Sequence, residues 1–128
     1  MYPQIKVGLS HFIEKHVADD DSATAYGSGM VSVFATPAMI ALMEKTALEC
    51  VSNLLPKRCT TVGTQINVAH VKATAIGQKV KCSAKIIEID RKKIVFEVNA
   101  EDEQGQIGFG THSRFIIDQD AFMSKLDG

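Results

Sequence analysis

The sequence predicts a single domain of the α+β class, in which one long helix precedes a sheet of antiparallel strands. Two patterns lead to this prediction. Apolar residues recur with a helical period from position 36 to about position 55. The period then changes to about two residues, as in strands, over four runs at about 64–72, 79–90, 93–101 and 106–118.

Length and charge limit the possible domains and partners. The 128 residues are 45% apolar, which is enough for one hydrophobic core, so we expect one domain over residues 1–128. The 14 basic and 15 acidic residues give a net charge of -1. No broad positive field is therefore expected to attract nucleic acid or an anionic membrane.

The composition also indicates the cellular compartment in which the protein is expected. The first ten residues lack the segments of a signal peptide, and no run approaches the roughly 20 apolar residues of a membrane span. The three cysteines, Cys50, Cys59 and Cys82, do not have the spacing of a metal or redox site. We expect a soluble cytoplasmic protein with reduced, mostly structural thiols, and with no metal or other cofactor.

The first third of the chain is expected to be extended or irregular. Residues 5–9 alternate between apolar and polar, residues 12–17 form a second strand-like stretch, and residues 19–22 mark a turn. Residues 23–33 are too rich in glycine for a firm helix and too apolar for a linker. We expect this segment to be a loop that covers another part of the molecule.

The helix has start and stop signals. Thr36 stands at the predicted N-cap with Pro37 at the first helical position, and Pro56 follows the predicted end. Residues 38–43 are all apolar, which predicts that the first half of the helix is buried on every side. Polar residues on one side of the second half predict a solvent-exposed face there.

The last three strands are joined by short polar links, which predict an antiparallel meander. The simplest packing wraps this sheet around the buried first half of the helix. That arrangement is the hotdog fold.

Glu44 is the most informative polar residue, because it follows six apolar residues in the part of the helix that should be buried. Its neighbours three and four positions away are apolar. Burial raises the pKa of a carboxyl group, which suits general acid-base catalysis. A position at the edge of the buried face, in contact with solvent, explains the residue equally well.

His70 and Thr36 each have a structural and a functional interpretation. His70 shares the more apolar face of its strand with Ile66 and Val68, where a single histidine is more often a core residue than a catalyst. If it faces the helix, it can pair with Glu44. Thr36 is expected at the N-cap for structural reasons, yet its hydroxyl lies beside free backbone N–H groups that can stabilise an oxyanion.

Three separated motifs resemble one protein family. They are residues 33–44, VFATPAMIALME, residues 62–70, VGTQINVAH, and residues 108–114, GFGTHSR. Together they resemble the fluoroacetyl-CoA thioesterase family of hotdog proteins, from about residue 5 to residue 123.

The resemblance implies a catalytic triad of Thr36, Glu44 and His70, with Gly63 and Arg114 as substrate-site residues. It implies hydrolysis of a short or medium acyl-CoA to free acid and CoA, with Glu44 acting either as a nucleophile or as a base. The resemblance, and a sheet that one helix covers only in part, also imply a homodimer. A non-catalytic acyl-CoA-binding hotdog protein and a hotdog dehydratase are the alternatives.

Two features of the sequence are not explained by this assignment. His112 belongs to the last motif without a mechanistic role, and we favour a structural one. Residues 25–30 are shorter than the lid of the fluoroacetate-specific enzyme and lack its phenylalanine. The resemblance therefore does not imply selectivity for a fluorinated acyl group.

Overall fold

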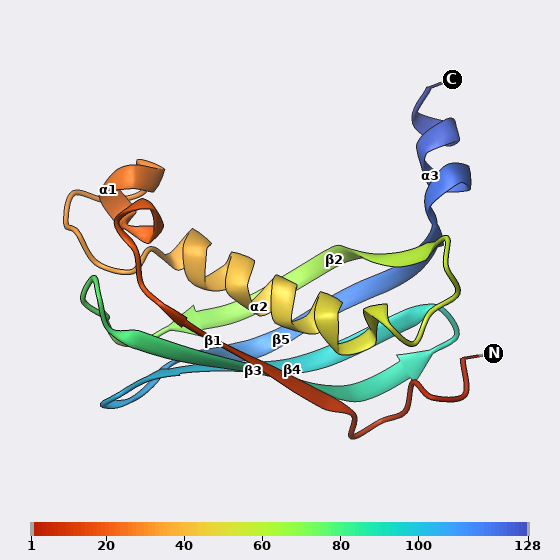
Figure 1. Ribbon diagram of the computed structural model, residues 1–128, viewed down its shortest axis with the longest axis horizontal. Helices are drawn as coiled ribbons and strands as arrows, with labels where there is room; N and C mark the ends of the chain where they lie inside the picture. The colour runs from red at the N-terminus through yellow and green to blue at the C-terminus, as the bar shows by residue number, and fades with distance from the viewer. Residues whose placement is uncertain (1, 128) are drawn as a thin grey trace.

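The computed structural model describes residues 2–127 as one antiparallel sheet that curves around one long helix (Figure 1). The helix is α2 (Thr36–Ser52). The five strands lie in the order β1-β3-β4-β5-β2. They are β1 (Ser10–His16), β2 (Cys59–His70), β3 (Lys79–Asp90), β4 (Lys93–Asp102) and β5 (Gly105–Asp118). The predicted α+β class is confirmed, and so is the predicted antiparallel meander of β3, β4 and β5.

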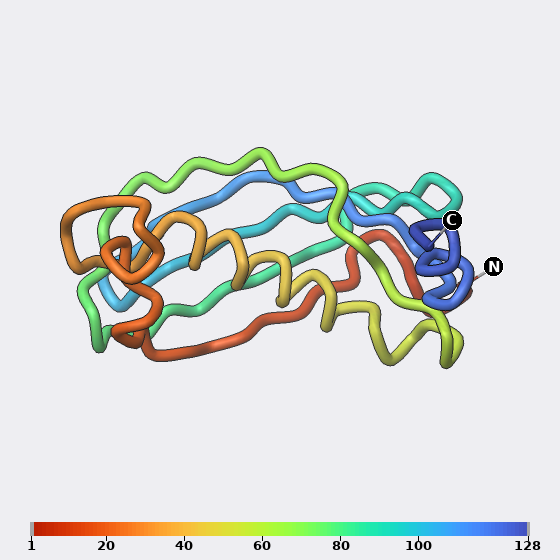
Figure 2. The backbone as a smooth tube through the Cα atoms, turned by 90° about the horizontal axis from the view of Figure 1, so that it is seen from above, coloured from red at the N-terminus to blue at the C-terminus, as the bar shows by residue number. Residues whose placement is uncertain are grey.

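Helix α2 packs on the concave face of the sheet through one side only. Met39, Met43 and Ala47 are fully buried there, together with inward-facing strand residues such as Phe96. Ala41 is exposed, so the prediction of burial on every side is wrong. The reason is that the sheet lies under the helix and leaves its opposite side open, as the view from above shows (Figure 2).

Both ends of α2 differ slightly from prediction. The N-cap is Ala35, and Thr36 is the first helical residue, so the Thr36 hydroxyl does not cap the helix. At the other end the helix stops at Ser52, three residues before Leu55. Leu55 precedes Pro56, and the helical region is sterically disfavoured for a residue before proline.

Strand β2 begins at Cys59, five residues earlier than predicted, and ends at His70 rather than at 72. Its first residues pair with the end of β5, where Cys59 lies opposite Asp118. Local alternation does not reveal a pairing between segments so distant in sequence. Cys59 therefore starts a strand, while Cys50 and Cys82 are buried as expected.

Strand β2 also forms one edge of the sheet. A bulge between Gly63 and Gln65 interrupts its pairing with β5. Residues 63–67 are exposed. Within residues 2–127 no strand pairs with the outer edge of β2, and an unpaired edge is a ready site for pairing with another chain.

The segment before α2 folds over the start of that helix (Figure 1). It contains a 3₁₀ turn (Asp19–Asp21), the short helix α1 (Ala23–Tyr26) and a loop. Bridges from Ser22 to Phe34 and from Val33 to Ala75 hold it there. The expectation that residues 23–33 form a cover is confirmed, with one helical turn that was not predicted.

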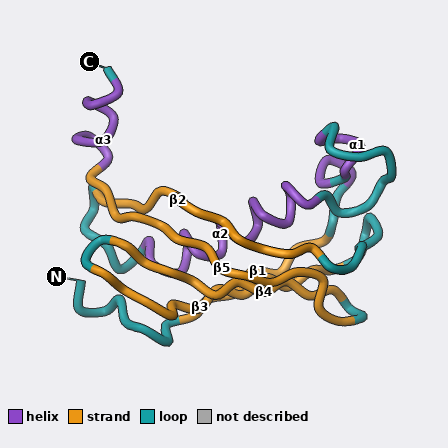
Figure 3. The backbone as a smooth tube through the Cα atoms, turned by 180° about the vertical axis from the view of Figure 1, so that it is seen from behind, coloured by secondary structure: helices purple, strands orange, loops and turns teal. Residues whose placement is uncertain are grey.

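The C-terminal helix α3 (Gln119–Leu126) follows β5 and extends away from the sheet (Figure 3). None of the helices in residues 2–127 combines the length and the apolar character that crossing a membrane requires.

Candidate functional site

The start of α2 and the end of β2 bring Thr36 and His70 together. Thr36 Oγ1 lies 2.8 Å from His70 Nδ1, within hydrogen-bonding distance. Both residues line a cavity of about 370 Å³, which the loop before the helix covers in part through Ser28 and Val33. Because Ala35 is the N-cap, the Thr36 hydroxyl is available to the histidine at the positive end of the helix.

The His70 imidazole is suited to proton transfer. Burial lowers its pKa below the usual 6.5, although the backbone of Lys72 opposes the shift. The ring is therefore neutral at pH 7 and can take up a proton. Phe34 packs edge-on against it at 6.4 Å between ring centroids. The Nε2 atom is buried, and no residue in the described part of the chain makes a hydrogen bond to it.

Glu44 lies eight residues after Thr36, about 12 Å further along the helix axis. It is half-buried and lines a second cavity, of about 280 Å³, with Gly63 and His112. A Cβ atom on Gly63 would lie 3.1 Å from His112 Cε1, 3.4 Å from Arg114 Nη1 and 3.6 Å from Glu44 Oε1. The missing side chain of Gly63 thus leaves a space bounded by a carboxylate and a guanidinium.

Arg114 is only 6% exposed and is fixed by several hydrogen bonds. Its Nε donates to Thr61 Oγ1 at 2.7 Å, and its Nη2 donates to the Thr61 carbonyl at 2.9 Å. Its Nη1 lies 3.0 Å from His112 Nε2. Burial lowers the pKa of the guanidinium, and the negative charge of Glu44 opposes that shift. A buried cation therefore faces the Gly63 space.

The predicted site residues form two groups in the single chain. Thr36 meets His70, whereas Glu44 meets Gly63 and Arg114. The pairing of Glu44 with His70, which the sequence left open, is not present within one chain, since no ion pair joins them among residues 2–127 and they line different cavities. Residues 63 and 70 lie about 23 Å apart along their strand, too far for one helix position to reach both.

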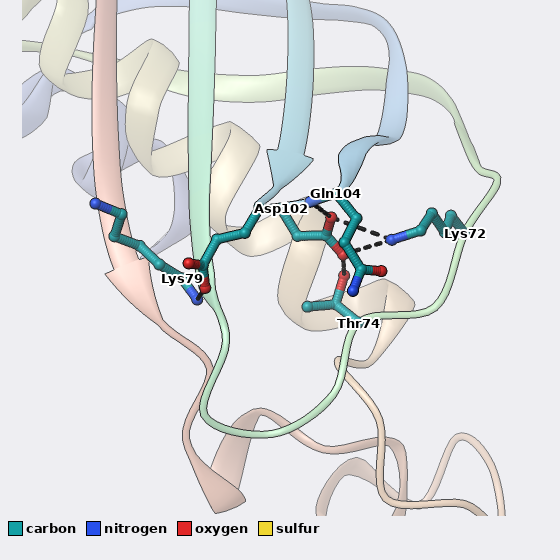
Figure 4. A network of polar contacts seen from close by, with 6 residues as sticks. Lys72, Thr74, Lys79, Asp102 and Gln104 are labelled. Carbon is teal, nitrogen blue, oxygen red and sulfur yellow. Dashed lines mark hydrogen bonds and ion pairs between the residues drawn. The ribbon is translucent and has the colours of Figure 1, made fainter.

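A network missed by the sequence analysis anchors the chain just after His70 (Figure 4). Lys72 Nζ lies 2.8 Å from Asp102 Oδ2, Thr74 Oγ1 donates to the same oxygen at 2.9 Å, and the Gln104 N–H donates to Oδ1 at 2.8 Å. Burial would raise the pKa of the Asp102 carboxyl, but these bonds outweigh it and hold the pKa below its usual value. Lys72 also lines the Thr36 cavity, so the network fixes one wall of it.

The free energy of unfolding should decrease as the pH falls below about 6.5. Burial lowers the folded-state pKa of His70 and of His112 below 6.5, so the unfolded chain binds protons at both residues first. The two histidines contribute fully to the free energy of unfolding at a pH above their pKa in the unfolded chain. This contribution is lost as the pH falls towards their lower pKa values in the folded protein. Urea unfolding between about pH 7.5 and about pH 5.5 tests this, because carboxyl groups titrate little there.

The control is a double variant, His70→Gln with His112→Gln, which should show a weaker dependence on pH in the same interval. A wild-type stability that does not change over this interval would contradict the assignment of both histidines as buried and neutral.

Comparison with known proteins identifies proteins that are similar to this chain in sequence and in structure. A model of the fluoroacetyl-CoA-specific thioesterase family FlK matches residues 17–120. A fluoroacetyl-CoA thioesterase from Streptantibioticus cattleyicolor is 33% identical over 94 residues, which are 73% of this chain and 68% of that protein.

Solved structures agree with this match. A structure of the fluoroacetyl-CoA thioesterase FlK superposes with a TM-score of 0.90 at 27% identity, over 96% of each chain. A mutant of FlK in complex with acetyl-CoA gives 0.91 at 26% identity, over 96% of this chain and 97% of that one. A hot-dog-like protein from Thermanaerovibrio acidaminovorans, 20% identical over 95% and 90% of the two chains, gives 0.88 and supports the fold alone.

The predicted hotdog fold is therefore confirmed. The family model covers most of the chain, including Thr36, Glu44 and His70. This protein belongs to the fluoroacetyl-CoA-specific thioesterase family.

Proposed function

We propose that this protein, a thioester hydrolase by family, hydrolyses a short or medium acyl-CoA to the free acid and CoA with Thr36, Glu44 and His70 as its catalytic residues. The observation that supports this most strongly is the space at Gly63, which faces the Glu44 carboxylate and the Arg114 guanidinium. The carboxylate can act as a base or a nucleophile in the attack on a carbonyl, and the guanidinium beside it can stabilise the oxyanion that forms.

The chemistry follows from these groups. Glu44 either attacks the thioester carbonyl, forming a mixed anhydride that water then cleaves, or removes a proton from the attacking water. Arg114 stabilises the negative charge on the carbonyl oxygen, together with the N-terminus of α2 from the partner subunit in the homodimer proposed below. In the base route, the neutral His70 receives the proton that Glu44 has taken from the water and passes it to the CoA thiolate as the carbon–sulfur bond breaks. In the nucleophile route, the thiolate leaves first and receives, through His70, the proton released when water cleaves the anhydride. Thr36 orients the imidazole.

A homodimer would bring together the two groups of site residues that lie apart in one chain, the Thr36–His70 pair and the group around Glu44. Antiparallel pairing of two β2 edges about a two-fold axis between Ile66 and Asn67 would place His70 of one subunit opposite Gly63 of the partner subunit. The Thr36–His70 pair of one chain then lies beside Glu44 of the partner subunit. The exposed face and unpaired edge of β2 support this arrangement.

A mixture of two inactive variants tests the shared site. Subunits carrying Glu44→Ala and subunits carrying His70→Ala should regain about a quarter of the wild-type activity when unfolded and refolded together, because half of the dimers then hold one complete site. Each variant refolded alone is the control. No recovery from a mixture shown to contain heterodimers, or a monomer in sedimentation, would contradict the shared site.

The activity itself is tested with a panel of acyl-CoA thioesters of increasing acyl length, with detection of the free CoA thiol. We expect turnover with short and medium acyl groups, and its loss in Glu44→Ala. Tight binding without turnover would instead indicate an acyl-CoA-binding protein.

Selectivity for fluorine should be weak. Residues 24–30 are exposed, and Gly27 has a φ of 72°, so the cover offers few fixed side-chain contacts to an acyl group. A small change in an apolar pocket is worth about 1–3 kcal/mol. We expect fluoroacetyl-CoA and acetyl-CoA to differ in kcat/KM by no more than about a hundredfold. Parallel steady-state kinetics would show a larger ratio if another part of the site discriminates.

A further inference from the structure

We infer that His112 is a positioning residue of the proposed thioesterase site, which holds the Arg114 guanidinium against the Gly63 space where the substrate carbonyl would bind. The inference rests on the proposed function, and it concerns a residue to which the family resemblance assigns no role. Its basis is a chain of hydrogen bonds that leads from the backbone of β2 through the imidazole to the guanidinium.

The hydrogen bonds determine which nitrogen of His112 carries the proton. His112 Nδ1 lies 2.8 Å from the carbonyl oxygen of Gln65, and a carbonyl can only accept, so Nδ1–H donates. In the neutral ring Nε2 is then unprotonated and accepts from Arg114 Nη1 at 3.0 Å. Burial, together with the positive charge of Arg114, lowers the pKa of His112 and keeps the ring in this neutral form.

The imidazole has little freedom to move. His112 is 2% exposed, and its ring stacks on Phe96 with 6.5 Å between centroids and 28° between planes. Phe96 is itself fully buried. The acceptor at Nε2 therefore has a fixed position relative to the sheet.

His112 holds the side of the guanidinium that borders the site. Thr61 binds Nε and Nη2, but Nη1 is the nitrogen that lies 3.4 Å from the position of a Gly63 Cβ. Arginine has five N–H donors, and these bonds leave Nη1 with one hydrogen free for a ligand. The guanidinium is planar, so the bond to His112, added to the two bonds to Thr61, holds the plane in which that remaining hydrogen lies.

A neutral acceptor suits this task better than a carboxylate. In addition to Glu44, which already faces Arg114 across the Gly63 space, a second carboxylate in place of His112 would neutralise the charge that a developing oxyanion needs, because opposite charges at this distance interact strongly in a buried site. The imidazole fixes the guanidinium and leaves its positive charge available. This chemical difference separates a positioning role from simple core packing.

Two substitutions test separately the two hydrogen bonds that the His112 imidazole makes, one to Gln65 and one to Arg114. His112→Gln can place an amide oxygen near the position of Nε2 and keep an acceptor for Arg114. His112→Asn can place its amide near Nδ1 and keep only the donor to Gln65. We expect His112→Asn to lower kcat by about 10-fold to 100-fold, less than loss of an oxyanion donor, with little change in KM, and His112→Gln to retain most of the rate.

A double-mutant cycle then asks whether His112 acts through Arg114. Adding His112→Asn to Arg114→Ala should cause little further loss of kcat, because the group being positioned is already gone. The inference would be overturned if kcat fell equally in His112→Asn and His112→Gln and in proportion to their loss of thermal stability. So would a full additional loss in the double variant.

A measurement without substrate distinguishes failure of this inference from failure of the proposed function. In nitrogen-detected NMR of the folded protein, rotation of the Arg114 guanidinium should be slow in wild type and in His112→Gln, and faster in His112→Asn. Identical rotation in all three proteins overturns the positioning role. Absence of turnover by wild type on the acyl-CoA panel, with the expected rotation, overturns the proposed function and leaves the positioning of Arg114 supported.

Discussion

Glu44→Ala is expected to lower kcat for acyl-CoA hydrolysis by about 10²–10⁴-fold or more, the range for loss of an acid-base group. The variant removes the carboxylate that borders the Gly63 space opposite Arg114. Glu44 is half-buried and makes no ion pair within residues 2–127, so the variant should fold, with a modest fall in melting temperature because the buried Arg114 loses a nearby negative charge. Steady-state kinetics with a short acyl-CoA, next to thermal unfolding, measures both effects.

Glu49→Ala is the matched control, because Glu49 is an exposed carboxylate five residues further along α2 and lies within hydrogen-bonding distance of His11 rather than at the site. It should retain wild-type kcat. A folded Glu44→Ala protein with wild-type turnover would refute the catalytic assignment. A comparable loss of rate in both variants would attribute the effect to the charge of the helix and not to the site.

His70→Ala should lower kcat by about 10²–10⁴-fold as well. The histidine accepts or passes on a proton next to Thr36, and alanine cannot replace that function. Thr36→Ser should retain most of the rate because it keeps the hydroxyl, whereas Thr36→Val should behave more like His70→Ala. Single-turnover kinetics on the same acyl-CoA would separate loss of chemistry from loss of binding.

His16→Ala serves as the control for histidine removal, since His16 is exposed at the end of β1. Its rate should equal that of wild type. An unchanged rate in folded His70→Ala would return His70 to a purely structural role, and the Thr36–His70 hydrogen bond would then stabilise only the junction of α2 and β2.

Patterns of short range determined much of the fold. The change from a helical to a two-residue period located α2, and the polar links between strands predicted the meander of β3, β4 and β5. These features depend on neighbours within a few positions, which the sequence displays directly. The three motifs also identified the family, because their residue types and intervals are specific.

The sequence did not reveal which of these residues touch. Thr36 was expected to cap its helix, but its hydroxyl meets His70, and Glu44 faces Gly63 and Arg114 instead of His70. His112 and Arg114 stand two positions apart on β5, and side chains two positions apart on a strand share one face. What they bind depends on the pairing of β5 with β2.

That pairing is a property of the tertiary structure. The bulge between Gly63 and Gln65 shifts the register of β2 against β5. This register sets Gly63 opposite Arg114 and Gln65 opposite Ser113, which brings the Gln65 carbonyl within reach of the His112 side chain. A shift of one residue would turn each side chain to the opposite face of the sheet. The sequence by itself thus determined the elements and the residue types of the site, whereas contacts between strands almost fifty residues apart decided its geometry, because register follows from the packing of the whole sheet on α2.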